Sequence, residues 1–163
     1  MKNWYAPYLR CRFEKKTFNA LQKKGIETYL PLIKEVHIWS DRKKKVEEPL
    51  FKGYIFVKTD LHDKEIILKT DGVIRFVGIK NKPSAIQDDQ INCIKIVLHS
   101  SNVVQRESYP SIGEQVEVVA GSLRGIRGIV SEARGKTKLV ILVDTISQAF
   151  SIEVQPEFLK VIN

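Results

Sequence analysis

The side chains that most often carry out covalent chemistry are few and scattered in this sequence. His37, His62 and His99 have no nucleophile or metal-ligand partner at a recognisable spacing. The same holds for Cys11 and Cys93, which lie far apart. No glycine loop of the Walker or dinucleotide-binding type is present. The sequence therefore predicts no catalytic residue, no metal site and no cofactor, and an enzyme is kept only as an alternative class.

The composition points to a cytoplasmic protein. No apolar run approaches the roughly 20 residues that a membrane span needs, and the first 13 residues lack the apolar core of a secretory signal. A disulfide between the two cysteines is one interpretation, and a reduced pair in the cytosol is the one we favour. We expect a monomer with no membrane partner.

The positive charge is concentrated near the start of the chain. The net charge is +8, and residues 1–53 contain 13 Lys or Arg against 6 Asp or Glu, which gives +7. A localised positive field favours a polyanionic partner such as nucleic acid. A basic surface that serves only solubility is the alternative.

Periodicity predicts the elements that would position these charges. Residues 3–9 are typical of a strand, and residues 12–24 of a helix that ends at Gly25. On the helical wheel one arc is largely apolar (Phe13, Thr17, Ala20 and Leu21), and the opposite arc is polar and basic (Arg12, Lys15, Lys16, Asn19 and Lys23). One face of the helix would pack on a core while the other presents positive charge.

The next segments predict strands. Residues 26–39 are mostly extended and interrupted by Pro31, and Asp41 to Lys45 is typical of a mobile hydrophilic hairpin tip or loop. The run from Leu50 to Val57 is apolar on both faces and is the strongest strand prediction. Helices in so small a domain would cover one face of its sheet, so the other face either meets a partner or is covered by another layer of the chain.

The remaining segments complete two predicted domains. A helix over 62–70, a strand over 73–77 and a helix over 87–98 predict an α+β fold in which helices pack on an antiparallel sheet. The polar stretch 100–110 is predicted to be a linker. Short strands and glycine-rich turns over 111–163 predict a small all-β barrel. The expected domains are therefore 1–99 and 111–163.

The segment 113–130, GEQVEVVAGSLRGIRGIV, is the most specific motif in the sequence. It resembles the KOW motif of SH3-like barrels, which occurs in NusG proteins and in certain ribosomal proteins. The positions that carry the resemblance are Gly113, Val116, Val118, Gly121, Leu123, Gly125, Gly128 and Val130. A KOW module binds protein or RNA, so an RNA-binding, ribosome-associated protein is the second alternative.

The N-terminal half resembles the NusG N-terminal (NGN) domain. The resemblance rests on Trp4-Tyr5, on EPLFKGYIFV over 48–57 and on DGVIRFVG over 71–78, in that order and spacing. Tyr8, Arg10 and EPLF…GYIFV look closer to the specialised paralogues RfaH and UpxY, which are operon-specific antiterminators.

This resemblance implies a docking surface for RNA polymerase. The family binds the clamp helices of the largest polymerase subunit and suppresses pausing and termination. Tyr8, Phe51 and Tyr54 match its docking residues, and Phe56 and Ile79 are further candidates. Core packing is the alternative for Phe51 and Tyr54. Phe51 and Tyr54 have opposite strand parity, so both would face the partner only if Lys52-Gly53 forms a turn or bulge.

The resemblance also implies a contact with the non-template DNA strand in the transcription bubble. The residues expected to make or support it are Arg10, Lys15, Lys16, Lys23 and Thr70. Ala20, Phe13 and Asp71 depart from the histidine, glutamine and arginine of RfaH, so any recognised DNA element would differ. The KOW domain would join ribosomal protein S10 or the termination factor Rho. Its β-branched residues over 139–154 favour a barrel over the helical hairpin that RfaH forms.

Overall fold

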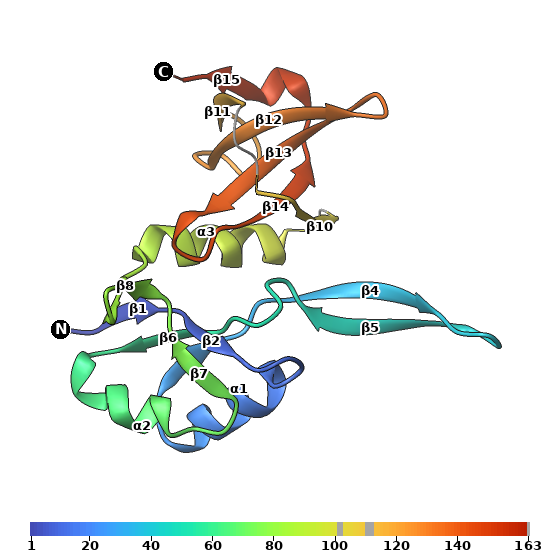
Figure 1. Cartoon of the computed structure of the whole chain (residues 1–163). Coiled ribbons are helices and arrows are strands. Elements are labelled where there is room, and N and C mark those ends of the chain that lie inside the picture. Colours follow the sequence, from blue (N-terminus) through green and yellow to red (C-terminus); the bar gives the residue numbers. More distant parts are fainter. Residues whose placement is uncertain (101–102, 110–112, 163) are drawn as a thin grey trace. The chain divides into compact units, whose positions relative to one another are not determined.

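The computed structural model describes residues 1–100, 103–109 and 113–162 (Figure 1). The chain forms two compact units, residues 1–88 (unit 1) and residues 89–163 (unit 2). The helix that begins at Asp88 therefore falls almost wholly in unit 2. The domain bounds expected from the sequence, 1–99 and 111–163 with a linker over 100–110, stay a prediction.

Unit 1 is built on antiparallel strands. Strands β1 (Asn3–Tyr5), β6 (Phe56–Thr59) and β3 (Glu27–Tyr29) form a sheet in the order β1-β6-β3. The strand predicted over 3–9 is interrupted at residue 6, so β2 (Pro7–Leu9) pairs separately with β7 (Val73–Phe76).

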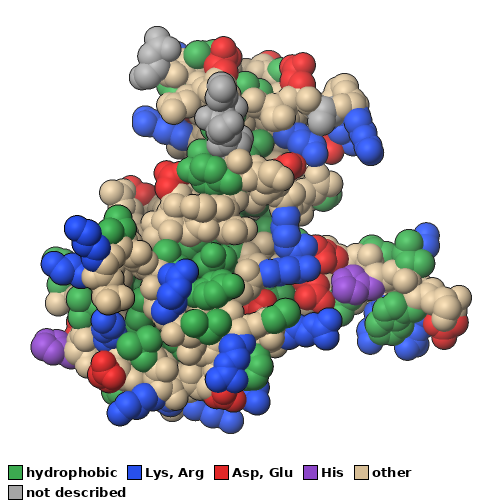
Figure 2. Space-filling model, viewed as in Figure 1, with side chains coloured by type: hydrophobic (Ala, Val, Ile, Leu, Met, Phe, Trp, Pro, Cys, Tyr) green, Lys and Arg blue, Asp and Glu red, His purple; other side chains and the backbone are tan. Residues whose placement is uncertain are grey.

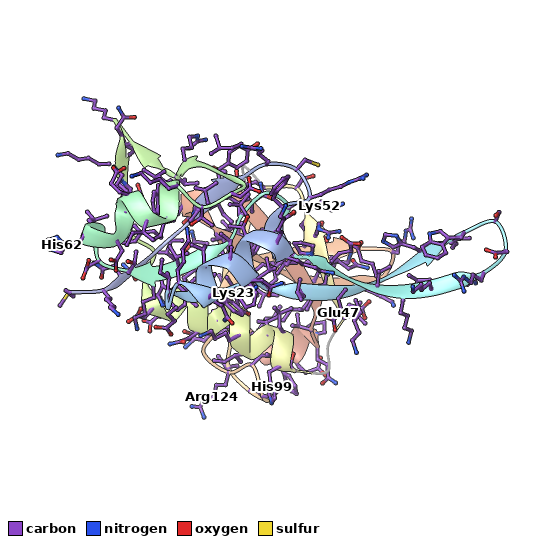
Figure 3. All side chains as sticks on the ribbon, turned by 90° about the horizontal axis from the view of Figure 1, so that it is seen from below. Lys23, Glu47, Lys52, His62, His99 and Arg124 are labelled. Carbon is purple, nitrogen blue, oxygen red and sulfur yellow. The ribbon has the colours of Figure 1, made fainter. Side chains whose placement is uncertain are left out.

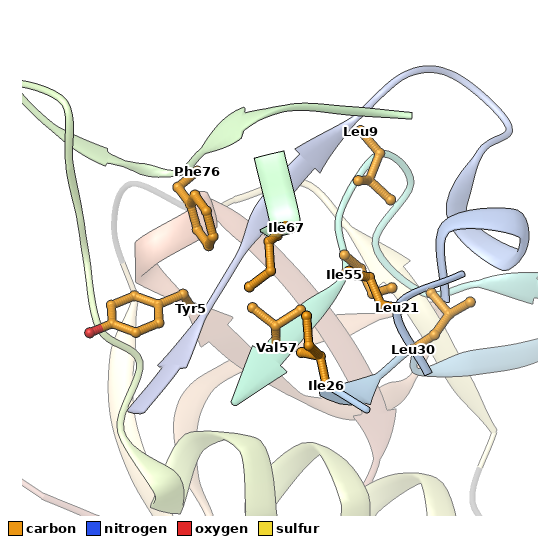
Figure 4. Packing of buried hydrophobic residues seen from close by; sticks show 9 residues of the cluster. All are labelled: Tyr5, Leu9, Leu21, Ile26, Leu30, Ile55, Val57, Ile67 and Phe76. Atoms are coloured by element: carbon orange, nitrogen blue, oxygen red, sulfur yellow. The ribbon is translucent and has the colours of Figure 1, made fainter. Parts of the chain in front are cut away.

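The helices of unit 1 bury their apolar faces. Helix α1 spans Glu14–Lys23, and its end at Lys24-Gly25, with Gly25 at φ +77°, agrees with the predicted stop. A 3₁₀ turn (Leu61–Asp63) leads into α2 (Lys64–Leu68). The core that these helices share with the strands contains Tyr5, Leu9, Leu21, Ile26, Leu30, Ile55, Val57, Ile67 and Phe76 (Figure 4).

Two hairpins extend from this core. Strands β4 (Leu32–Ile38) and β5 (Lys43–Pro49) form a long hairpin, and β8 (Gly78–Ile79) and β9 (Lys82–Pro83) form a short one. The turn of the long hairpin is closed by Trp39 N–H, which donates to the Arg42 carbonyl at 2.8 Å. Of the two alternatives predicted for residues 41–45, the hairpin tip is therefore the one observed, and residues 43–45 already pair in β5.

The segment from Leu50 to Ile55 is a turn, buried at Leu50, Phe51 and Ile55, and not the strand that its apolar run predicted. Tyr54 N–H donates to the Phe51 carbonyl at 3.2 Å, and Gly53 has φ +87°. That backbone conformation suits glycine, and it takes the chain out of the extended geometry. The turn at Lys52-Gly53 on which the sequence interpretation depended is present, and the strand begins only at Phe56.

Over its described residues, unit 2 combines one α-helix and two short 3₁₀ helices (Asp144–Ile146 and Pro156–Phe158) with a single antiparallel sheet. Its helix is α3 (Asp88–His99), and its strands are β10 (Val104–Glu107), β11 (Glu114–Val118), β12 (Arg127–Ala133), β13 (Lys136–Val143), β14 (Gln148–Glu153) and β15 (Leu159–Val161). The strand order is β10-β14-β13-β12-β11-β15. The fold class expected from the sequence, an α+β region followed by a small all-β region, is confirmed.

Part of the expected linker is ordered. Residues 104–107 form β10, which pairs with β14. Lys138 Nζ lies 2.9 Å from Gln105 Oε1 and 3.5 Å from Glu107 Oε1. The linker prediction also covers residues 101, 102 and 110, which lie outside the described residues.

Candidate interaction surfaces

Two tyrosines of the predicted docking set lie together on unit 1. Tyr8 on β2 forms an isolated bridge with Tyr54, and their ring centroids are 5.3 Å apart at a tilt of 49°. The Arg75 guanidinium lies 5.3 Å from the Tyr8 ring centroid. Both tyrosines are half-buried, so each keeps part of its surface open. Rigid aromatic side chains of this kind commonly provide most of the binding energy at protein interfaces.

A groove of about 710 Å³ runs beside Tyr8. One wall is the segment from Tyr8 to Lys15, and the other is the base of the β4–β5 hairpin with Glu35, His37 and Glu48. His37 Nε2 is 3.6 Å from Glu35 Oε2 and 3.9 Å from Glu48 Oε1, so this histidine lies between two carboxylates of its own hairpin. The groove therefore lies between a wall that carries the Tyr8 ring with the cations of Arg12 and Lys15 and a wall that carries two carboxylates.

Glu14 fixes the turn that forms the floor of this groove. Its side chain is buried, and Gly53 N–H donates to Glu14 Oε2 at 3.2 Å. A β-carbon on Gly53 would lie 3.3 Å from Tyr8 Cε1, so the turn packs directly against the tyrosine ring. The start of α1, the 51–54 turn and Tyr8 form one connected structure.

Phe51 and Phe56 are core residues in this structure. They are 2% and 0% exposed, and their rings make an edge-to-face contact at 6.0 Å. The expectation that both present surface to a partner is wrong, because the turn directs these rings into the interior. Their direct contact with polymerase would require them to be uncovered, and it stays a prediction. Ile79 on β8, in contrast, is 73% exposed.

The basic end of α1 is organised around an aromatic ring. The Arg10 guanidinium lies 5.6 Å and Lys16 Nζ 5.2 Å from the centroid of Phe13. Lys16 also approaches Asp71 at 3.5 Å, but both side chains are largely exposed, so this pair adds little stability. Two cations are thus held next to each other with most of their charge uncompensated.

A glycine supports this cation–aromatic cluster. Gly72 has φ +95°, and a β-carbon there would lie 2.5 Å from Thr17 Oγ1 and 2.7 Å from Phe13 Cδ1. Its carbonyl accepts from Arg10 N–H at 2.8 Å, while the buried Thr17 hydroxyl donates to the Asp71 carbonyl at 2.9 Å. The 71–72 turn therefore locks the segment around Arg10 onto α1.

Of the other residues predicted to contact nucleic acid, Lys23 is exposed, and Lys15 and Thr70 make hydrogen bonds within unit 1. Lys23 is exposed on α1 (Figure 3). Lys15 is exposed, but its Nζ donates to the Glu47 carbonyl at 2.6 Å and so holds the β4–β5 hairpin. Thr70 is 4% exposed; its hydroxyl donates to the Ile66 carbonyl and accepts from Lys24 Nζ. The DNA contact predicted for Thr70 stays a prediction, and it would require this hydroxyl to be released from the end of α2.

Sequence reasoning missed three of the residues that shape these surfaces. Arg75 follows from no motif, because only the β2–β7 pairing places it opposite Tyr8. Glu14 belongs to a charged run in the sequence, although a carboxylate in the first turn of a helix commonly meets backbone N–H groups. The helical wheel places Phe13 on the core face, but this residue is half-buried and carries two cations.

The KOW positions lie in the first part of the unit 2 sheet. Val116, Val118 and Leu123 are buried. The glycines lie just before β11, in the β11–β12 connection and at the start of β12 (Gly113, Gly121, Gly125 and Gly128), and Val130 is half-buried in β12. A smaller hollow of about 170 Å³ is lined by Val118, Leu123 and Phe158. These positions build the sheet, and binding to S10 or Rho stays a prediction.

Neither a membrane span nor a metal cluster is found in the described part of the chain. No described helix is long and apolar enough to cross a bilayer, and no three His, Cys, Asp or Glu side chains among the described residues are grouped to hold a metal. Cys11 and Cys93 are free thiols. Burial raises the pKa of Cys93 to about 11.

Comparison with known proteins identifies the relatives of this chain. Three proteins named transcription termination/antitermination protein NusG are similar to it. That of Thermus thermophilus is 29% identical over 140 residues, 76% of this chain and 74% of that protein. That of Chlamydia pneumoniae is 28% identical over 157 residues, 88% and 85% of the two chains. The match to the Rickettsia bellii protein is 30% identical and spans 67% of this chain but 58% of that protein.

Solved structures and a family model agree with these relatives. The structure described as "Domain interaction in Thermotoga maritima NusG" superposes with a TM-score of 0.61 at 17% identity, covering 100% of this chain and 98% of that chain, which supports the fold. Residues 2–95 match the family model described as "Transcription termination factor nusG". Since this match covers more than half of the sequence, the chain belongs to the NusG family.

Proposed function

We propose that this protein is an operon-specific transcription elongation and antitermination factor. It binds the clamp helices of the largest RNA polymerase subunit, contacts the non-template DNA strand and suppresses pausing and termination. The proposal is supported by membership of the NusG family and by the names of the relatives, which are termination/antitermination proteins. The specialised RfaH- or UpxY-like character is part of the proposal and rests on Tyr8, Arg10 and the 48–57 segment.

The open groove beside the Tyr8–Tyr54 pair is the observation that carries the proposal. It is large enough, at about 710 Å³, to admit side chains of a partner. The Tyr8 ring that lines it is held by Arg75 and by the Gly53 turn, so this part of the surface is preorganised. Phe51 and Phe56 are buried in this structure, so their part in docking would require a rearrangement of the 51–56 segment.

The Arg10–Lys16 pair over Phe13 supports the DNA contact. Cations that approach phosphates raise the affinity for a nucleic acid without reading its sequence. Lys23 adds a third exposed cation, on α1. A base-specific element, if one is read, must be read through different side chains than in RfaH, because Phe13, Ala20 and Asp71 differ. Ribosomal protein S10 or Rho is the proposed partner of unit 2.

Tyr8→Ala tests the docking surface. We expect the variant to fold and to lose polymerase binding by at least tenfold, because truncation of an aromatic anchor commonly costs about 2 kcal/mol or more. Affinity would be measured by biolayer interferometry with immobilised polymerase core enzyme. Trp39→Ala is the matched control, since it removes an exposed aromatic side chain elsewhere in unit 1.

Two results would decide against the proposal. Unchanged binding of Tyr8→Ala would remove the groove from the interface. An equal loss in Trp39→Ala would show that the effect is not specific to the groove.

Phe51→Ala tests the core position of that ring. We expect the free energy of unfolding to fall by about 3 kcal/mol or more because of the cavity left in the core, and this loss is measured without polymerase.

A further inference from the structure

The β4–β5 hairpin has two unlike faces. In its register Lys34 lies opposite Glu47, Val36 opposite Lys45 and Ile38 opposite Lys43. Residues directly opposite each other in an antiparallel pair project from the same face of the ribbon. These six residues therefore form one surface, here called the outer face. The other face carries Glu35, His37 and Glu48.

The outer face is exposed along its whole length. All six of its residues are exposed, with Val36 at 57% and Ile38 at 74%. On the other face Glu35, His37 and Glu48 are half-buried and line the groove described above. Figure 2 shows apolar and basic side chains together with a histidine on the projecting β4–β5 hairpin. Exposed apolar side chains grouped on one face can mark an interaction site.

The hairpin is anchored at its base. Lys15 Nζ on α1 donates to the Glu47 carbonyl at 2.6 Å, and Leu50 N–H donates to the Pro31 carbonyl at 2.9 Å. Seen from below, Glu47 lies at the end of the arm nearest α1, and the arm reaches away from the rest of unit 1 (Figure 3). An element held in this way presents its outer face without first having to order it.

The charge of the hairpin increases toward the tip. Residues 36–46 contain four Lys or Arg and one Asp, which gives +3, whereas Glu35, Glu47 and Glu48 lie at the base. At the tip, the Arg42 guanidinium and Lys44 Nζ lie 5.3 and 5.4 Å from the Trp39 ring. These cation–aromatic contacts group positive charges without neutralising them. The tip therefore suits a polyanion.

We propose that the outer face binds double-stranded DNA in its major groove. A groove about 12 Å wide admits a two-stranded β-ribbon. Lys43 and Lys45 contact phosphates, while Val36 and Ile38 make apolar contacts such as those with thymine methyl groups. Duplex RNA is a poor alternative, because its major groove is too narrow for a ribbon. This site goes beyond the proposed function and uses neither the Tyr8 groove nor Arg10 and Lys16.

The test measures binding of the full chain to a labelled 20-base-pair DNA duplex by fluorescence anisotropy across a KCl series. Lys43→Ala combined with Lys45→Ala should weaken binding at least tenfold at low salt. It should also lower the slope of log K against log salt by about 1.8, since each lost phosphate contact contributes about 0.9. Lys80→Ala with Lys82→Ala removes the same charge from the β8–β9 hairpin and is the matched control.

A second variant separates apolar contacts from charge. Val36→Ser with Ile38→Ser keeps every cation, so it should reduce affinity several-fold at an unchanged salt slope. Circular dichroism establishes that each variant is folded. Tyr8→Ala should bind the duplex like the parent chain, which keeps this result independent of the polymerase proposal.

Several outcomes would overturn the inference. They are equal effects of the β4–β5 and β8–β9 variants, an unchanged salt slope in the Lys43/Lys45 variant, and equal affinity for a duplex RNA of the same sequence. Strong binding to phosphatidylglycerol vesicles through the same lysines, with weak binding to DNA, would assign the face to a membrane surface instead.

Discussion

The two units use their charged residues in opposite ways. Unit 1, residues 1–88, contains 19 Lys or Arg and 11 Asp or Glu, a net charge of +8. Unit 2, residues 89–163, contains 8 of each and has no net charge. The whole positive excess of the protein therefore belongs to unit 1.

The contacts of these residues follow the same division. In unit 1 cations lie over aromatic rings, as Arg10 and Lys16 do over Phe13 and Arg75 does over Tyr8, although Lys16 also meets Asp71 at 3.5 Å. In unit 2 cations meet carboxylates on neighbouring strands, with Arg127 at 2.9 Å from Glu117 and Lys136 at 3.1 Å from Glu153. An aromatic ring positions a cation and leaves its charge in place, whereas a carboxylate cancels it. Unit 1 is thus suited to a polyanion and unit 2 to a neutral partner surface.

The largest expected effect comes from breaking the support of the Phe13 cluster. Gly72→Ala places a β-carbon 2.5 Å from the buried Thr17 hydroxyl at φ +95°. We expect the free energy of unfolding of unit 1 to fall by on the order of 3 kcal/mol, because backbone strain and a core clash add together. Urea unfolding followed by tryptophan fluorescence reports on unit 1, since both tryptophans, Trp4 and Trp39, lie there.

Unit 2 offers a matched control for this substitution. Gly125 also has φ +95°, but a β-carbon added there would meet no described atom within 4 Å, so Gly125→Ala carries backbone strain without a clash. We expect a loss of about 1 kcal/mol. Equal losses at the two glycines would show that Gly72 has no special role in holding α1.

The pH dependence of stability should distinguish the units at alkaline pH. Burial raises the pKa of the Cys93 thiol in unit 2 from 9.0 to about 11, and that of the Tyr29 phenol in unit 1 from 10.0 to about 12. Between each pair of values the unfolded group loses its proton while the folded group keeps it. The unfolded state then binds fewer protons, so the free energy of unfolding falls as pH rises.

Unit 2 should therefore weaken first. Its stability is expected to be unaffected by this thiol below pH 9 and to decrease by about 2 kcal/mol toward pH 11. Cys93→Ala should remove that decrease, while Cys11→Ala, at an exposed thiol, should leave it unchanged. Circular dichroism in urea at a series of pH values measures both. An identical pH profile for Cys93→Ala and the parent chain would contradict the assignment.

The smallest expected effect concerns single-stranded DNA. Arg10→Ala with Lys16→Ala should lower the slope of log K against log salt by about 1.4, since each phosphate contact to a single strand contributes about 0.7. Arg124→Ala with Lys160→Ala removes two exposed cations from unit 2 and should change nothing. Anisotropy of a labelled 20-nucleotide strand provides the slope. Equal salt slopes for the two double variants would show that the cations of the two units do not differ in their contribution to binding single-stranded DNA.

Local sequence determined much of this protein. The spacing of apolar and basic residues over 12–24 predicted α1, its exposed basic face and its end at Gly25. This was possible because an amphipathic helix repeats its apolar face at the helical period, and because a glycine commonly ends a helix. The alternating and glycine-rich pattern after residue 112 predicted the all-β region, and the motifs predicted the family that the comparison confirmed. The concentration of charge before residue 54 is a property of the sequence alone.

Tertiary structure decided which of these residues are accessible. The apolar run over 50–57 is compatible with a strand or a buried turn, and only its packing around Gly53 directs Phe51 inward and leaves Tyr54 half-open. Thr70 and Lys15 were predicted to meet DNA, but both make long-range hydrogen bonds within unit 1; Thr70 is buried, while Lys15 stays exposed. The outer face of the β4–β5 hairpin likewise follows from its register. Burial and strand pairing depend on contacts between residues that are distant in the chain. A local sequence pattern does not say which distant residues will meet.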